Sequence, residues 1–266
     1  MIHPRTLLIS LPFLFFTLFT GCSSATSEEN ATPQPFGALF AGTSDGSFGA
    51  TGCIQNGTNC TGTPPQPEWA AFDPKWESYF SYDETSMTIT ANDSCRSVST
   101  GPINNCIFTV GDNGVTEISF DFAISGPCHA EEYGTDWLAF WIYSDPWVGT
   151  AEVDFIEACS GPIRGGLNTN FDAHGQQIGI FQQDDPNWQG TITAKFTGSG
   201  SNVHAQVTNS HNNQTASTYL SKDSGYLFVL DTSPTNAKGC TVTISNLTMQ
   251  GSVGSGQGCV GLITSN

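Results

Sequence analysis

Short stretches rich in β-branched and aromatic residues recur along most of this chain, with turn-forming residues between them. Val, Ile, Thr and aromatic side chains favour strands, whereas Asn-Gly, Asp-Pro, Gly-Ser and Ser-Pro pairs favour turns. Only residues 67–78 show a weak helical period. Many short strands without alternating helices predict an all-β fold, an antiparallel β-sandwich or jelly roll. The expected strands are 86–90, 115–124, 136–143, 151–158, 177–181, 190–196, 202–208, 224–230 and 241–249.

The charge balance is strongly acidic and limits the class of partner. The chain has 7 Lys and Arg against 24 Asp and Glu, a formal net charge of −17. Binding of nucleic acid needs clustered basic side chains, and so does docking on anionic lipid through a basic patch. We therefore expect no nucleic acid as partner, whereas a neutral polysaccharide is not repelled. Acidity also keeps an exported protein soluble, so charge alone does not identify a ligand.

The first residues have the pattern of an export signal. A basic residue precedes an apolar run at 7–20, which is too short to span a bilayer and fits the core of a signal peptide. The stretch LFTGC at 18–22 resembles a bacterial lipobox, in which cleavage leaves a lipidated cysteine. We expect a signal peptide at 1–21, a lipid anchor on Cys22 as the only membrane attachment, and an exported protein at the outer membrane or cell surface. Cleavage near Ala25 with release to the extracellular medium is the alternative.

Composition divides the remaining chain in two. Residues 22–66 are rich in Ser, Thr, Gly, Pro and Asn and cannot bury much apolar surface, so we expect a lipidated tether. The expected strands all lie within 67–266, which we interpret as one β-jelly-roll domain stapled by disulfides. We expect this domain to be a monomer.

Nine cysteines constrain the covalent framework. With Cys22 assigned to the anchor, eight remain, and an even set in an exported protein is typical of disulfides. The cysteines have no C-x2-C spacing and the histidines are not clustered, so we expect neither a metal nor a cofactor. Eight cysteines allow 105 pairings, among which short loops favour local ones. The expected pairs are Cys53–Cys60, Cys95–Cys106, Cys240–Cys259 and, by elimination, Cys128–Cys159.

The most specific motif is the acidic strand EVDFIE at 152–157. Side chains of a strand alternate between its faces, so Glu152 and Asp154 share one face while Glu157 would point into the core. A buried carboxylate without partners costs several kcal/mol. A β-bulge at 155–156 would restore the phase and place all three acids on one face, with one of the two bulge residues facing the core.

Three carboxyl groups on one face suit acid–base chemistry. Four ladder steps separate the outer Cα atoms by about 13 Å. Two glutamates leaning toward each other can bring their carboxyl groups near the roughly 5–5.5 Å separation of a retaining glycosidase. Repulsion among the three favours one protonated acid beside an ionised partner, which is the pair that this mechanism requires.

Together with WLAFW at 137–141, the acidic strand resembles the bulged E-x-D-x-x-E signature of family 16 glycoside hydrolases, as in laminarinase-like members; family 7 cellulases share the acid spacing. The resemblance implies a concanavalin A-like jelly roll that cleaves β-glycosidic bonds with retention. It implies that Glu152 is the nucleophile, Glu157 the acid/base and Asp154 the residue that tunes the nucleophile. By analogy, the expected substrate is a β-1,3- or mixed-linkage β-glucan cleaved in endo fashion, or used as donor by a transglycosylase.

Aromatic residues near the acids are candidates for stacking on sugar rings. Trp137 and Trp141 share one face of their expected strand, and Trp147 lies in the following loop. His174 follows the acidic strand and could contact the substrate, while Trp188 could be a further loop platform. Each has a structural alternative, because aromatic residues often belong to the core and a lone histidine is more often structural.

Two other classes of protein compete with the enzyme. A carbohydrate-binding surface lipoprotein of the same fold would bind a glycan without turnover. A structural or adhesion lipoprotein would place one of the three acids away from the common face. A Ser–His–Asp hydrolase is disfavoured, because the chain has no G-x-S-x-G elbow and no α/β pattern.

Overall fold

The part of the protein that the structure describes is mostly β-strand. The structure is a computed structural model, and it contains two antiparallel seven-stranded sheets and two short 3-10 helices among the described residues, η1 (Phe36–Leu39) and η6 (Gly258–Leu262). None of the helices in this part of the chain is long and apolar enough to cross a membrane. The described residues are 36–42, 80–90, 96–100, 106–125, 138–144, 151–157, 167–171, 176–181, 188–211, 213–232, 241–254 and 258–264.

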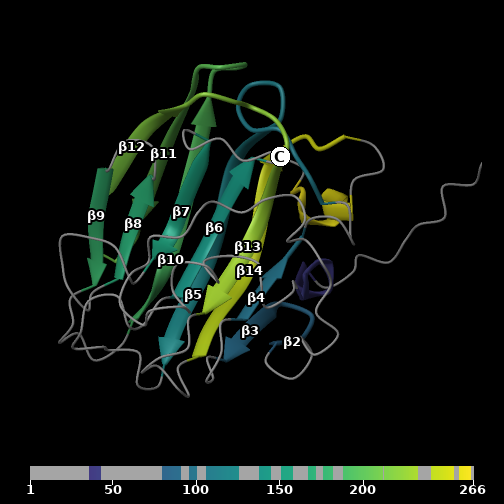
Figure 1. The fold of residues 1–266 in the computed structure, drawn as a ribbon, viewed down its shortest axis with the longest axis vertical. Helices are drawn as coiled ribbons and strands as arrows, with labels where there is room; N and C mark the ends of the chain where they lie inside the picture. The colour runs from purple at the N-terminus through teal and green to yellow at the C-terminus, as the bar shows by residue number, and fades with distance from the viewer. Residues whose placement is uncertain are drawn as a thin grey trace, which may run out of the picture. The chain divides into compact units, whose positions relative to one another are not determined.

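The first sheet contains the acidic strand. In spatial order its strands are β1 (Ala41–Gly42), β4 (Arg96–Ser99), β13 (Tyr226–Thr232), β6 (Leu138–Ser144), β7 (Glu152–Glu157), β8 (Leu167–Phe171) and β9 (Gln176–Phe181). Strands β6 to β9 are consecutive in sequence and adjacent in the sheet, and Figure 1 shows them side by side next to β13. The acidic strand β7 therefore lies inside the sheet, between β6 and β8.

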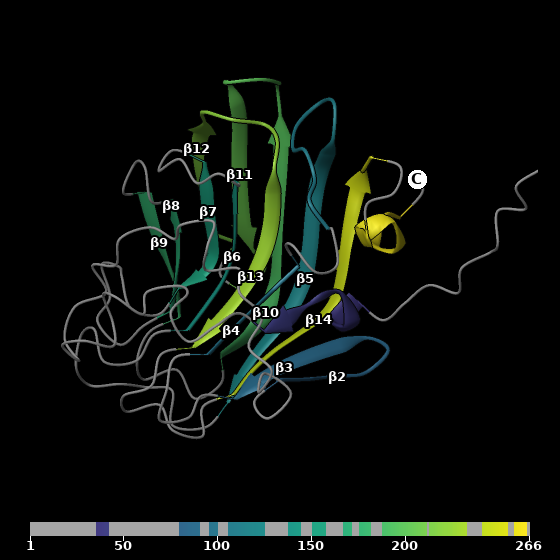
Figure 2. The same cartoon turned by 45° about the vertical axis from the view of Figure 1, so that its right-hand side comes forward.

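The second sheet packs against the first. Its strands, in spatial order, are β12 (Thr215–Leu220), β11 (Val203–Asn209), β10 (Trp188–Thr197), β5 (Val115–Ser125), β14 (Thr241–Gly251), β3 (Ser86–Thr90) and β2 (Phe80–Tyr82). Figure 2 shows β14, near the C-terminus, in this layer with β3 and β2. The chain passes several times from one sheet to the other, as in a jelly roll, so the predicted fold class is confirmed.

Alternation along the strands creates the two faces of the second sheet. In β11, Val203, Ala205 and Val207 are fully buried, while the residues between them are partly or fully exposed. The outward positions of this sheet carry hydroxyl groups that pair across strands, as between Thr88 and Thr243 with 3.0 Å between the two oxygens. This period of two is the pattern that a half-buried antiparallel sheet requires.

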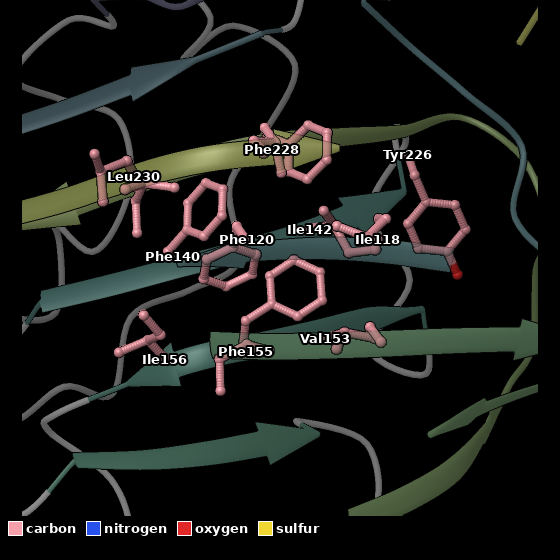
Figure 3. Packing of buried hydrophobic residues seen from close by; sticks show 14 of the residues in the cluster. Ile118, Phe120, Phe140, Ile142, Val153, Phe155, Ile156, Tyr226, Phe228 and Leu230 are labelled. Atoms are coloured by element: carbon pink, nitrogen blue, oxygen red, sulfur yellow. The ribbon is translucent and has the colours of Figure 1, made fainter. Parts of the chain in front are cut away.

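Aromatic rings from both sheets form the centre of the core (Figure 3). Phe120 of β5 meets Phe140 of β6 edge-on, with ring centroids 4.8 Å apart. Phe140 also stacks on Phe228 of β13, with centroids 5.7 Å apart and ring planes 6° from parallel. Phe155 of β7 contacts Phe120 with centroids 5.5 Å apart. These contacts join the second sheet directly to the back of the acidic strand.

The packed domain begins earlier than the composition indicates. Residues 36–42, expected to lie in the tether, form η1 and β1, and β1 pairs with β4. Phe40 is 1% exposed, and its ring lies 6.3–6.4 Å from those of Phe80, Phe140 and Phe228. The apolar sequence FGALF supplies enough hydrophobic surface to join the core despite its polar surroundings.

One disulfide within the described residues corrects the expected pairing. Cys106 bonds to Cys259 across a sequence separation of 153, so the expected pairs Cys95–Cys106 and Cys240–Cys259 are wrong. The preference for short loops fails because the folded sheets bring the two Cα atoms within 4.8 Å. The expected pairs Cys53–Cys60 and Cys128–Cys159 lie outside the described residues.

Candidate functional site

The acidic strand contains the bulge that its sequence predicts. Strands β6 and β7 pair in antiparallel register, and the register shifts by one residue at Phe155, which has no partner position on β6. The pairing of β7 with β8 is also irregular between Asp154 and Glu157. The paired positions of β6 and β7 are Tyr143 with Glu152, Ile142 with Val153, Trp141 with Asp154, Phe140 with Ile156 and Ala139 with Glu157.

The bulge brings the three acidic positions into phase. Positions 152, 154 and 157 lie opposite Tyr143, Trp141 and Ala139, which alternate along β6 and so occupy one face of the sheet. Without the extra residue, position 157 would fall in phase with the core-facing residues. For Glu157 the structure describes the backbone alone. Its register position opposite Ala139 is therefore what places it on the face of Glu152 and Asp154.

Core packing explains why the bulge forms at this place. Val153, Phe155 and Ile156 are each 0% exposed and belong to the core between the sheets. The sequence predicts that one of the two bulge residues faces the core, whereas both do. Two consecutive residues can do so because together they oppose one residue of β6. Burying both side chains stabilises the bulge by about 3–6 kcal/mol relative to exposing them.

The two described acidic side chains differ in exposure. Glu152 is partly exposed, whereas Asp154 is 5% exposed, and neither is without a partner. Two strand residues on the same face have Cα atoms about 6.6 Å apart, so a buried aspartate can act on the neighbouring glutamate. Of the two acids, Glu152 therefore keeps the larger exposed surface, and the buried Asp154 lies beside it on the same face.

Two asparagines occupy register positions beside the acids on β8. Asn170 lies opposite Asp154 and Asn168 lies opposite Glu157. Direct partners of an antiparallel pair share a face of the sheet, so these positions belong to the same surface as the acids. Sequence reasoning did not select them, although the alternation in LNTNF at 167–171 is a signal that could have done so.

The face beside the acids is apolar and buried over β6 and β13. Trp141 and Tyr143 are 4% and 5% exposed, with ring centroids 5.1 Å apart, and they pack with Ala139, Leu227 and Val229. This cluster is separate from the core between the sheets, to which the alternate residues of β6 belong. Its burial leaves the Trp141 ring little free surface, and the sugar-stacking role of Trp141 stays a prediction.

Of the other predicted site residues, the structure describes only Trp188. Trp137, Trp147, His174 and Cys22 lie outside the described residues, so their roles stay predictions. The interpretation of Trp188 as a loop platform is wrong, because it is the first residue of β10 and is 1% exposed. Its indole packs in the core, which a large apolar ring favours over a solvated loop.

No group of three or more His, Cys, Asp or Glu side chains within the described ranges is placed to hold a metal ion. Lys195 and Glu117, on the outer face of the second sheet, form an ion pair of 3.7 Å between side-chain nitrogen and oxygen. At 62% and 22% exposure of the two side chains, such a pair contributes little to stability.

Solved structures similar to this one have low sequence identity to it. An endo-1,3-beta-glucanase from Streptomyces sioyaensis is similar over 63% of this chain and 77% of its own, at 15% identity and a TM-score of 0.44. Basic winged bean lectin is similar over 62% of this chain and 89% of its own, at 13% identity and a TM-score of 0.36. Peanut lectin is similar over 61% and 86%, at 12% identity and a TM-score of 0.37. No protein-family model and no curated protein sequence matches the chain. An enzyme and two lectins stand among these structures, so the likeness does not separate catalysis from carbohydrate binding.

Proposed function

We propose that this protein is a retaining glycoside hydrolase of the family 16 type that acts on a β-linked polysaccharide. The observation that carries the proposal is the bulge at Phe155, which gives Glu152, Asp154 and Glu157 register positions on one face of the sheet. Core packing accounts for the bulge, and its consequence is that three acidic positions share one face of the strand, which is the arrangement that a pair of catalytic carboxyl groups requires. The family resemblance of the motif adds the substrate class, for which β-1,3- or mixed-linkage glucan is the first choice.

The proposed chemistry has two steps. In the first, the protonated carboxyl group of Glu157 donates its proton to the glycosidic oxygen while the bond from that oxygen to the anomeric carbon breaks. The carboxylate of Glu152 forms an ester bond to the anomeric carbon from the opposite side. In the second, Glu157, now ionised, accepts a proton from water, whose oxygen attacks the same carbon and breaks the ester bond. Two inversions give net retention.

Asp154 has a supporting role in this proposal. It is buried, and it lies two residues from Glu152 on the same face. A carboxyl group there can hydrogen-bond the nucleophile and hold its orientation as charge moves to the sugar. We assign no direct bond-making step to it. The roles of Trp137, Trp147 and His174 in binding the sugar remain predictions from the sequence.

The proposal is tested by reducing-sugar release from laminarin, mixed-linkage glucan, xyloglucan, carboxymethylcellulose, agarose and carrageenan. The protein is produced from residue 33 onward, because the compact unit begins there and includes η1 and β1. Turnover of one polymer should fall at least about 10³-fold in Glu152→Gln. Glu117→Gln is the matched control, because it removes one carboxylate from the other sheet and should retain wild-type turnover.

Turnover unaffected by Glu152→Gln would refute the assignment of the nucleophile. A folded protein that binds one of the polymers without cleaving it would instead be a carbohydrate-binding protein of the same fold. Sugar captured from the intermediate by a second glycan, rather than by water, would identify a transglycosylase.

We also propose that the protein is exported and anchored at the cell envelope through Cys22, with signal peptide and tether before the packed domain. The support is the lipobox-like sequence at 18–22. Full-length protein expressed in a bacterium should partition into the detergent phase of Triton X-114, and Cys22→Ala should move it to the aqueous phase. Equal partition of both proteins would contradict the anchor.

A further inference from the structure

An aromatic pair stands in solvent on the outer face of the second sheet, at the end of the sheet formed by β12, β11 and β10 (Figure 2). Tyr219 of β12 and His204 of β11 are direct cross-strand partners, and their ring centroids are 5.1 Å apart. Tyr219 is 59% exposed and His204 is partly exposed. The residues before and after each of them are buried at 0–6% exposure, so both rings lie on the side of the sheet that faces away from the core.

Hydroxyl and amide side chains continue this face beside the rings. Its outward positions form three rows of cross-strand neighbours, and successive rows lie two residues, about 6.8 Å, apart along each strand. The rows are Tyr219–His204–Thr197, Ser217–Gln206–Lys195 and Thr215–Thr208–Thr193. The hydroxyl oxygens of Thr208 and Thr215 lie 3.0 Å apart. A pair of hydroxyl groups keeps donor and acceptor capacity beyond the bond between them, so this face can bond a ligand rich in hydroxyl groups.

The charge of this face restricts the partner that it can bind. Strands β10, β11 and β12, whose residues the structure describes throughout, contain no Asp or Glu, although the chain has a net charge of −17. Lys195 is the single Lys or Arg of these three strands, and Glu117 of β5 offsets its charge at 3.7 Å. The net charge of the chain repels an anionic partner, and a cationic partner finds no carboxylate on these strands. A neutral partner meets neither obstacle.

The mixture of one aromatic pair with polar rows favours a sugar polymer over a protein. A stable protein interface has a contiguous apolar centre, which three rows made mostly of hydroxyl and amide groups do not provide. A sugar ring presents C–H groups on its faces and hydroxyl groups at its edges. The first pack on an aromatic ring, and the second bond polar side chains placed beside it.

We infer that the outer face of β10, β11 and β12 binds a chain of a neutral polysaccharide. Tyr219 and His204 form the platform under one sugar ring, and the polar rows bond the units that follow. The acidic positions of β7 belong to the first sheet and face away from the second, so this surface is separate from the proposed catalytic site and does not depend on it. Where the protein also cleaves the polymer, binding at a second surface raises the local concentration of substrate.

Native affinity electrophoresis tests the inference, in gels that contain mixed-linkage glucan, xyloglucan or the anionic carboxymethylcellulose. Every protein carries Glu152→Gln, so that the polymers stay intact. At least one neutral polymer should retard the protein, and Tyr219→Ala should weaken the dissociation constant about fivefold or more, the loss expected of one aromatic contact. Tyr219→Phe keeps the ring and should keep binding. Tyr82→Ala is the matched control, because it removes a tyrosine that is 46% exposed on β2, at the opposite end of the same sheet.

Equal retardation of Tyr219→Ala and its parent overturns the inference, provided that circular dichroism shows both to be folded. Absence of retardation by either neutral polymer overturns it as well, and so does an effect of Tyr219→Ala in carboxymethylcellulose alone. A dimer in sedimentation velocity that Tyr219→Ala converts to a monomer would assign the face to a second copy of the chain instead. None of these results bears on cleavage, which release of reducing sugar by the protein with Glu152 intact measures, so the failures of the two proposals are distinguishable.

Discussion

The core packing behind the acidic strand gives a prediction whose size can be worked out. Phe140 is 0% exposed and contacts rings of both sheets: it stacks on Phe228, meets Phe120 edge-on and lies 5.8 Å from Phe155. Phe140→Ala removes the ring and leaves a cavity, which lowers the free energy of unfolding by about 3–5 kcal/mol in well-packed cores. Aromatic pairs contribute about 0.5–1.5 kcal/mol beyond their buried area. We therefore expect a loss of about 4 kcal/mol.

Urea unfolding followed by circular dichroism measures this loss, with disulfides kept intact. The midpoint should fall while the slope stays constant, since the surface exposed on unfolding hardly changes. Thermal unfolding should shift by roughly 8–16 °C, at about 2–4 °C per kcal/mol for a domain of this size. Tyr219→Ala is the control, because Tyr219 is 59% exposed and should change stability by less than about 0.5 kcal/mol. Equal losses in the two variants would refute the account of the core.

Three further perturbations follow from single features. Replacing Cys106 and Cys259 together by Ala should lower the free energy of unfolding by about 3–5 kcal/mol in a denaturant titration, since their bond closes a loop over a sequence separation of 153; a loss below 1 kcal/mol would contradict this. Gly251→Ala should destabilise by more than about 2 kcal/mol, because φ is 110° and a new Cβ would meet the carbonyl oxygen of Gly114; unchanged thermal unfolding would contradict it. Burial raises the pKa of Tyr226 above its ordinary value, so the unfolded state ionises first and stability falls as pH rises above about 10. In Tyr226→Phe this alkaline loss should shrink when unfolding is compared at pH 8 and pH 10.5.

The sequence predicts the strands that have their own strong pattern and misses those that depend on neighbours. The expected strand 86–90 coincides with β3, and 241–249 differs from β14 only at its end. Strands β4, β8 and β12 were not expected, because RSVS, LNTNF and TASTYL contain few large apolar residues. Hydrogen bonds to adjacent strands stabilise such segments as strands, and the local sequence does not indicate which strands will be adjacent.

Some features of the candidate site could be predicted from the local sequence, and others depend on strands that are distant in the chain. The bulge could be predicted because a glutamate in the wrong phase would enter the core, a conflict visible within six residues. The buried apolar cluster over β6 and β13 could not, because it depends on β13 lying beside β6, some 80 residues earlier in the chain. The Cys106–Cys259 disulfide could not be predicted for the same reason. Loop length alone favours local pairs, whereas the fold brings two distant cysteines together.

The central claim is that Glu152 attacks the sugar, and covalent trapping tests it most directly. A 2-deoxy-2-fluoro glycoside of the accepted sugar slows release of the ester more than its formation, so the intermediate should accumulate. Intact-mass and peptide mass spectrometry should then find one glycosyl unit per protein, attached to the peptide that contains Glu152, and none in Glu152→Gln. A label on another residue, or steady turnover that yields the inverted anomer without any label, would contradict the account.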